Sequence, residues 1–446
     1  MHKKTILIIG EVFLDTHLDI IDVNGPLVRL GGIFHSARAC AAIGIEYALA
    51  YYAPLYMEDD INHFSFVLNT KGCHRLGIID KAPNVMLINE SKEIGDQGYY
   101  NIIKDQAKII EIGDIQEIIY KVRPTDIIIF PGRYNTNKII KDLSGFEGNI
   151  HIDYHYDSED ILLNTETKIT TISISTSSSL FKHHCNGELK TMLNYFKHYN
   201  IELFLVKENR GGAYCYSVLE EKIYESPAYY IPTMHSVGVG DVYSSVFISN
   251  LNQIDLEKNM KLSSLCASQY AGTMYYEKFE SNIKIILRDI EEWILLEGTR
   301  LSWDERKDKN IYIAAPDFPH INTDILDKLV DCLNYHNFVA RLPIKENGLV
   351  NETTSLDVEL RIYQKDIELL SICDLLIAVL LFNDPGTLVE LGMFQQSGKP
   401  TIIFDPYNIC DNMFVKNTPN FMCKTIGQVI DATFQCLKRR WQYGRL

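Results

Sequence analysis

Three carboxylates and one tyrosine in the last third of the chain have the residue types that glycosidic chemistry needs. Tyr312 lies in the apolar run IYIAA, and Asp366 lies before the apolar run LLIAV. Asp384 and Glu390 lie six positions apart in the segment DPGTLVELG. One carboxylate can attack or stabilise an anomeric carbon while another group protonates or orients the departing base. Together the four residues predict a site that cleaves an N-glycosidic bond.

Each of these residues also has an ordinary structural explanation. Asp384 can make the turn that Gly386 permits, Asp366 can pair on a helix surface, and Glu390 can be solvated. For any one residue alone this explanation is favoured. The number and order of the residues favour the site.

The elements that would position these residues are short apolar runs separated by longer helical segments. The clearest runs are TILIIG (5–10), DIIIF (126–130), ELFLV (202–206), IYIAA (311–315), LLIAV (375–379) and TIIF (401–404). Unalternated apolar strands are typical of parallel sheets covered on both faces. The chain is therefore predicted to be α/β and doubly wound, with ligands at the carboxyl ends of the strands.

A polar segment near residue 300 predicts two domains. The stretch EGTRLSWDERKDKN (297–310) has many charged residues and no apolar periodicity, and a new buried strand follows it. We therefore assign 1–296 to a first domain, 297–308 to a linker and 309–446 to a second domain.

The second domain resembles nucleoside 2-deoxyribosyltransferases and their nucleotide N-glycosidase relatives over about residues 309–446. The matching features occur in the family's order: IYIAAPDF, an Asp before the helix–strand unit, D-x-G-T-x-x-E-x-G and GKP at 398–400. The resemblance implies a flavodoxin-like doubly wound fold that needs no cofactor. It implies that Glu390 is the nucleophile, that Asp366 and Asp384 handle the base and its proton, and that Tyr312 orients Glu390. The substrate-binding residues that it implies are Phe318, which would stack on the base, Asp317 and Gly386.

The segment Asn420-Phe421-Met422 is similar to the Asn-x-Met of these transferases, which serves a neighbouring subunit's sugar site. This similarity implies a homo-oligomer and favours a free nucleoside over a nucleotide. A turn Asn after Pro419 is the alternative explanation. Transfer to another base and hydrolysis by water both stay open.

A glycine-rich turn in the first domain has the composition of an anion site. Gly238-Val239-Gly240 is followed at once by an apolar, helix-like run. Unpaired N–H groups at a helix start favour an anion, and Asp241 beside them could take a proton from an attacking hydroxyl. The alternative is that Asp241 only caps the helix.

The first domain also resembles ribokinase-like (PfkB-type) sugar and nucleoside kinases, over about residues 1–295. GVGD is similar to the family's GAGD, and Gly31-Gly32 is similar to its glycine pair. The resemblance implies ATP and Mg²⁺ as cofactors, Asp241 as catalytic base and Gly238, Val239 and Gly240 as anion hole. It implies that the substrate is bound by Asp15, Gly31 and Gly32.

Several positions depart from the kinase pattern. Ser36 stands where the family has Asn, Lys207 and Asn209 stand where it has Thr and Gly, and His235-Ser236 replaces Asp-Thr. The family's Asn-x-x-Glu has no clean match, because Asn186-Gly187-Glu188 has the wrong spacing. A degenerate kinase-like domain that senses a ligand and regulates its neighbour is the alternative.

One further cluster could hold a metal. His151, Asp153 and His155 alternate in HIDYHYD, and residues two apart on a strand share a face. A polar cleft filled by these side chains is the favoured explanation, so no metal site is assigned.

Composition limits the partners. The chain has 43 Lys+Arg and 58 Asp+Glu, a formal charge of −15, which argues against coating a nucleic-acid polymer. Ten scattered cysteines without a CxxC pair predict reduced thiols in a cytoplasmic protein. No apolar stretch reaches membrane-spanning length. The expected partners are small nucleosides or nucleotides, with no membrane.

Overall fold

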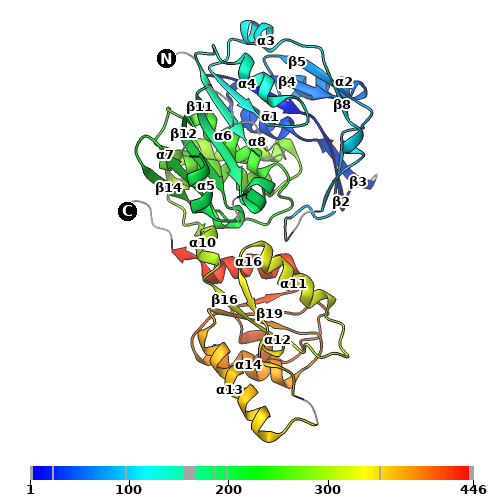
Figure 1. Ribbon diagram of the computed structural model, residues 1–446, viewed down its shortest axis with the longest axis vertical. Helices are drawn as coiled ribbons and strands as arrows, with labels where there is room; N and C mark the ends of the chain where they lie inside the picture. The colour runs from blue at the N-terminus through cyan, green and yellow to red at the C-terminus, as the bar shows by residue number, and fades with distance from the viewer. Residues whose placement is uncertain are drawn as a thin grey trace. The chain divides into compact units, whose positions relative to one another are not determined.

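The structure is a computed structural model that describes residues 4–22, 25–95, 98–154, 167–184, 187–196, 199–350 and 353–440. The chain divides into two compact units (Figure 1). The N-terminal unit consists of residues 1–93, 97–300 and 441–446, and the C-terminal unit consists of 94–96 and 301–440. Each is described by itself.

The N-terminal unit is built on a ten-stranded sheet in the order β14-β13-β12-β11-β10-β9-β1-β4-β5-β8. The seven strands from β12 to β5 run parallel, and β13, β14 and β8 pair antiparallel at the two edges. The strands are β1 (Thr5–Glu11), β4 (Glu46–Ala53), β5 (Cys73–Asp80), β8 (Lys108–Glu111), β9 (Asp126–Ile129), β10 (Asn149–Asp153), β11 (Ile169–Ser175), β12 (Ile201–Lys207), β13 (Ala213–Ser217) and β14 (Lys222–Ser226).

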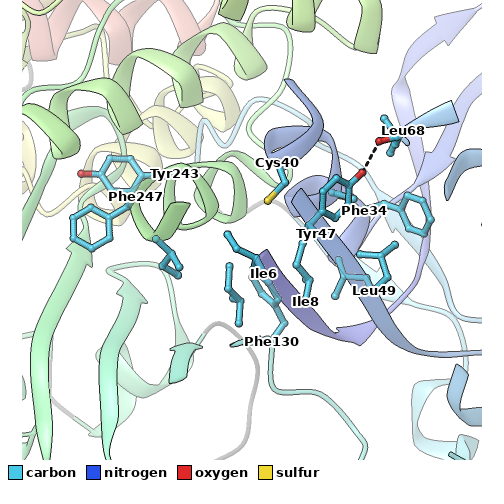
Figure 2. Close-up of a cluster of buried hydrophobic side chains, with 14 of the residues drawn as sticks. Ile6, Ile8, Phe34, Cys40, Tyr47, Leu49, Leu68, Phe130, Tyr243 and Phe247 are labelled. Carbon is cyan, nitrogen blue, oxygen red and sulfur yellow. Dashed lines mark hydrogen bonds between the residues drawn. The ribbon is translucent and has the colours of Figure 1, made fainter. Parts of the chain in front are cut away.

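Strands β1 and β9 are largely apolar and are buried along their length, which is typical of parallel strands covered by helices on both faces. Every residue of β1 is buried. Its Ile6 and Ile8 belong to a core cluster with Phe34 of α1 and Phe247 of α6, and the cluster includes Tyr47, whose hydroxyl donates to the Leu68 carbonyl at 2.9 Å (Figure 2). The helices of this unit are α1 (Ile33–Ile43), α2 (Glu58–Val67), α3 (Ile115–Val122), α4 (Thr136–Asp142), α5 (Leu189–Phe196), α6 (Val239–Asn250), α7 (Leu256–Ala271), α8 (Tyr276–Arg288) and α9 (Ile290–Trp293).

A second, four-stranded sheet of the N-terminal unit has the order β3-β2-β6-β7. Its strand β2 follows β1 directly and pairs antiparallel with β3, so Asp15 lies opposite Arg29. The strands are β2 (Leu14–Asp22), β3 (Gly25–Leu30), β6 (Val85–Ile88) and β7 (Tyr99–Asn101).

The C-terminal unit has a five-stranded sheet in the order β17-β16-β18-β19-β20, and all its pairings are parallel. In chain order this is 2-1-3-4-5, the flavodoxin-like doubly wound arrangement with its switch point between β16 and β18. The strands are β16 (Asn310–Ala314), β17 (Val339–Arg341), β18 (Leu375–Val379), β19 (Thr401–Phe404), β20 (Phe421–Cys423) and β21 (Arg439–Arg440). The helices are α10 (Trp303–Arg306), α11 (Asp324–Tyr335), α12 (Pro343–Asn347), α13 (Leu356–Ile372), α14 (Pro385–Gln396), α15 (Met413–Asn417) and α16 (Ile426–Leu437).

The predicted α/β class and doubly wound C-terminal sheet are confirmed by these pairings. The segment predicted as a linker, 297–308, contains strand β15 (Thr299–Arg300) and α10, and its Leu301, Trp303 and Arg306 are buried. None of the helices in the described ranges combines the length and apolarity needed to cross a membrane.

Candidate active sites

A pocket of about 140 Å³ opens at the carboxyl ends of the C-terminal strands. The loops that follow β16, β17 and β18 all contribute to it, as parallel strands on either side of a switch point require. Its lining residues are Ile313, Ala315, Asp317, Phe318, Leu326, Leu342, Pro343, Ile344, Asp366, Asp384, Gly386, Thr387 and Glu390.

Tyr312 and Glu390 meet beside this pocket. Tyr312 is fully buried on β16, and its hydroxyl donates to Glu390 Oε1 of α14 at 2.6 Å. Burial raises the pKa of Glu390 to about 7, and the nearby carboxylates of Asp366 and Asp384 add to this, whereas the Tyr312 hydrogen bond opposes it. Glu390 therefore changes charge near neutral pH.

Asp384 caps helix α14 and also lines the pocket. Its Oδ2 accepts hydrogen bonds from Thr387 N at 2.7 Å and Thr387 Oγ1 at 2.9 Å, and Pro385 occupies the first turn. A Cβ added to Gly386 would lie 3.1 Å from Asp384 Oδ2, which leaves little room for a side chain there. Asp384 thus caps the helix and lines the pocket at the same time, so these two roles do not exclude each other.

Asp366 of α13 lines the same pocket and is held by a residue that the sequence did not single out. Asn347, the last residue of α12, donates from Nδ2 to Asp366 Oδ1 at 2.7 Å. Burial raises the pKa of Asp366, and this hydrogen bond partly offsets the rise. The segment Asn347-Gly348 signals a helix end in the sequence, but nothing there indicates the partner on α13.

The remaining predicted residues of the C-terminal site divide into two groups. Asp317 and Phe318 line the pocket, and Asp317 Oδ2 is buried without a hydrogen-bond partner among the residues that the structure describes. Asn420 lies at the opposite edge of the sheet, where its Oδ1 accepts from Thr401 N at the start of β19 at 2.8 Å. Asn420 is therefore not brought to the pocket of its own chain.

In the N-terminal unit, the glycine-rich turn begins α6 as expected. Gly238 has φ 74°, and Asp241 lies in the first turn and is 8% exposed. Burial raises the pKa of Asp241, and the neighbouring Asp153 adds to the rise. Lys207 lies close by: its Nζ donates to both oxygens of Asp153 at 2.7 and 2.9 Å and to Ser244 Oγ at 3.1 Å.

Asp15 and the glycine pair lie against this turn through His35. The His35 ring contacts Asp15 Oδ2 through Nε2 at 3.0 Å and the Tyr270 hydroxyl through Nδ1 at 2.8 Å. A Cβ added to Gly238 would lie 2.1 Å from His35 Cγ, and one added to Gly31 would lie 2.2 Å from the Asp15 oxygens. Gly32, with φ 59°, would meet the Glu11 carbonyl at 2.1 Å. The structure therefore brings the predicted residues together, and close packing explains each glycine.

Two basic side chains near Asp15, Arg29 and His17, were missed from the sequence. Arg29 donates to His235 Nδ1 and to the Val237 carbonyl, each at 3.3 Å, and His17 Nδ1 contacts Ser91 Oγ at 2.7 Å. Burial lowers the pKa of His17 to about 4, so that ring is neutral at pH 7. Only the strand pairing of β2 with β3 places Arg29 opposite Asp15, and the sequence does not give that register.

The described residues of the proposed His151–Asp153 cluster already have other partners. Both oxygens of Asp153 are occupied by Lys207, and His151 Nε2 contacts Asp126 Oδ1 at 3.2 Å. His155 and Asn186 lie outside the described residues. Within the described part of the chain, no three acidic, His or Cys side chains are grouped to hold a metal.

Comparison with known proteins finds a family match in the C-terminal unit. Residues 311–422 match the family model described as nucleoside 2-deoxyribosyltransferase. A comparison with curated proteins finds no match.

Comparison with solved structures finds kinases over the rest of the chain. The tetrameric inhibited form of phosphofructokinase-2 from Escherichia coli is 13% identical, with 64% of this chain and 100% of that chain covered and a TM-score of 0.49. A ribokinase from Thermotoga maritima is 13% identical, with 64% and 99% covered and a TM-score of 0.47. Ribokinase from Arabidopsis thaliana, complexed with ribose and ATP, is 11% identical, with 63% and 99% covered and a TM-score of 0.44. In its C-terminal unit, by contrast, the chain is similar to the nucleoside 2-deoxyribosyltransferase family over residues 311–422.

Proposed function

We propose that the C-terminal domain breaks the N-glycosidic bond of a deoxynucleoside through Glu390. The observation that carries this proposal is the 2.6 Å hydrogen bond from Tyr312 to Glu390 at a pocket that Asp366 and Asp384 also line. The Glu390 carboxylate attacks C1′ while the C1′–N bond breaks, and the base leaves with the bonding electron pair. The product of this step is a glycosyl ester on Glu390.

The neighbouring groups prepare Glu390 for this attack. Tyr312 holds one carboxylate oxygen at a fixed place, so the other oxygen is directed to C1′. Burial keeps the Glu390 carboxylate weakly solvated and raises its pKa, which makes it a better nucleophile than an exposed glutamate.

Proton transfer falls to Asp366, with Asp384 fixing the turn beneath the sugar. Asp366 gives its proton to the departing base, and in the second step it accepts the proton of an incoming base that attacks C1′ and frees Glu390. Water in place of the second base would give hydrolysis. None of the described residues that line the pocket is basic, which favours an uncharged nucleoside over a nucleotide.

Replacement of Glu390 tests this proposal. The Glu390→Ala protein should release base from deoxynucleosides at least about 10³-fold more slowly, because the nucleophile is gone. Full activity in that variant would refute the proposal. Product analysis with and without an acceptor base then separates transfer from hydrolysis.

For the N-terminal domain we propose ATP-dependent phosphorylation of a sugar or nucleoside hydroxyl, with Asp241 as base. The start of α6 would hold the phosphates of ATP, and ATP would supply the phosphoryl group. The burial of Asp241 beside Asp153 supports a base poised near neutral pH. Phosphoryl transfer that persists in an Asp241→Asn protein would count against this role.

A ligand-sensing domain without turnover is the second candidate, and one observation favours it. Lys207 donates to both carboxylate oxygens of Asp153, and the His35 ring contacts Asp15 Oδ2. Two carboxylates of the site therefore already have partners. Nucleotide binding without phosphoryl transfer would support sensing. Measuring nucleotide binding and phosphoryl transfer on the same preparation decides between a kinase and a ligand sensor.

We also propose that Asn420 serves a neighbouring subunit in a homo-oligomer. Asn420 lies at the sheet edge opposite its own pocket, which is compatible with a contact to the pocket of a neighbouring subunit. Restored activity on mixing Asn420→Ala and Glu390→Ala proteins would support shared sites, and no restoration would argue against them.

A further inference from the structure

Asn347 contacts Asp366 but does not line the pocket. Its Nδ2 lies 2.7 Å from Asp366 Oδ1, whereas the residues of the same segment that line the pocket are Leu342, Pro343 and Ile344. Asn347 therefore lies behind Asp366 as seen from the pocket. Asn347 can thus act on a bound nucleoside through Asp366.

The helix that ends at Asn347 is anchored on both sides. Glu346 of α12 accepts from Arg341 Nε at 2.9 Å, and Lys345 pairs with Asp327 of α11 at 3.2 Å. Arg341 also donates to Asn310 Oδ1 of β16 at 3.0 Å, so the anchor reaches the strand that carries Tyr312. A short helix fixed to β16, β17 and α11 can hold the Asn347 amide at a constant place.

We infer that Asn347 is a positioning residue that fixes Asp366 Oδ1 as a hydrogen-bond acceptor and so leaves Oδ2 as the oxygen that exchanges the proton with the base. This inference rests on the proposed function. An amide N–H cannot accept a proton, and a proton on Oδ1 would face the N–H of Asn347. The proton of Asp366 is therefore confined to Oδ2.

The step is balanced in atoms and electrons. As the C1′–N bond breaks, its electron pair goes to the base nitrogen, and the proton on Asp366 Oδ2 moves to the base. Asp366 is left as a carboxylate, which Asn347 stabilises through Oδ1. The acceptor base returns a proton to Oδ2 when it attacks C1′.

Burial opposes the ionisation of Asp366, and the hydrogen bond from Asn347 favours it. Glu390 of α14 and Asp384 at the start of α14 are carboxylates, and Tyr312 of β16 is neutral. The charged residues of α12, Lys345 and Glu346, are paired with Asp327 and Arg341. Among the described residues, Asn347 is the hydrogen-bond donor to Asp366. Its removal should raise the pKa of Asp366 further.

A pair of substrates separates this role from simple packing. The full-length Asn347→Leu protein is tested on 2′-deoxyguanosine, whose base needs a proton to leave, and on 7-methyl-2′-deoxyguanosine, whose cationic base leaves without one. We expect kcat to fall about 10- to 100-fold for the first and less than about threefold for the second. The alkaline limb of the kcat profile for deoxyguanosine should move to higher pH.

The control is Asn417→Leu, which changes the last residue of another five-residue helix, the exposed α15. It should leave both rates unchanged. If the Asn347→Leu protein has a lower melting temperature than the wild type, the experiment is repeated with Asn347→Ala, which has a smaller side chain.

Equal losses on the two substrates, or no loss on either, would overturn the inference. Activity that survives in Glu390→Ala would refute the proposed function itself. That result does not depend on how the kcat losses of Asn347→Leu compare between the two substrates. If Glu390→Ala is inactive and Asn347→Leu loses the same activity on both substrates, only the role of Asn347 is refuted.

Discussion

The two sites contain similar carboxylates in opposite electrostatic settings. In the N-terminal unit, Asp15, Asp241 and Lys207 are 4%, 8% and 7% exposed, and the Lys207 ammonium neutralises Asp153. In the C-terminal unit, Asp366, Asp384 and Glu390 line a pocket whose described residues include no basic side chain. A fixed cation stabilises the ionised form of a buried acid, and its absence favours the protonated form. The buried Asp153 carboxylate is thus paired with a cation, whereas none of the described residues that line the C-terminal pocket offers one.

The largest expected effect on stability comes from breaking the N-terminal ion pair. Lys207→Met leaves the Asp153 carboxylate buried at 1% exposure without its cation, which should lower the free energy of unfolding by about 3–5 kcal/mol. Denaturation with urea, followed on the full chain, measures this loss.

The double variant Asp153→Asn/Lys207→Met is the matched control and should recover most of the lost stability. In the C-terminal pocket, Asp366→Asn should leave stability unchanged or higher, because burial disfavours the Asp366 carboxylate and an amide has no charge to bury. Equal destabilisation by Lys207→Met and by Asp366→Asn would refute the electrostatic contrast between the sites.

A smaller effect is expected from Tyr312→Phe. The variant removes the 2.6 Å hydrogen bond to Glu390 and keeps the ring in its buried place. Loss of the bond should lower kcat for base release by about 10- to 100-fold. The pKa of Glu390 should rise, so the acid limb of the rate profile should move to higher pH. An unchanged limb would show that Tyr312 does not set the charge of Glu390.

The smallest effect is a pH dependence of stability carried by Glu390. Its pKa is about 7 in the folded protein against an ordinary 4.5, so the folded protein keeps this proton to higher pH than the unfolded chain. The resulting stability is fully present below about pH 4.5 and is lost as the pH rises through 7. Glu390→Gln should therefore stabilise the protein more at pH 8 than at pH 5, by on the order of 2 kcal/mol. A constant difference between wild type and variant across this range would contradict the raised pKa.

The sequence predicts best what one strand, turn and helix determine locally. Tyr312 on a buried strand and Asp384 and Glu390 on a turn and its helix follow from the order of apolar runs, and the structure brings them to one pocket. The GVGD turn likewise begins a helix as expected.

Contacts between separate elements could not be predicted in the same way. Asn347 and Asp366 lie on different helices, and Lys207 reaches Asp153 across 54 positions of sequence. Arg29 lies opposite Asp15 only through the register of β2 and β3, which depends on the tertiary fold. The burial that raises the pKa values of Asp366, Glu390 and Asp241 likewise depends on the tertiary fold, so these properties of each site required the structure.

The most direct test of the central claim is to trap the glycosyl ester. The protein is mixed with a deoxynucleoside without acceptor base, quenched in acid, digested and analysed by mass spectrometry. The account predicts that the peptide containing Glu390 gains the mass of one deoxyribosyl group and that Glu390→Gln does not. Base release by the wild type with no adduct on that peptide, or with an adduct on another carboxylate, would contradict it.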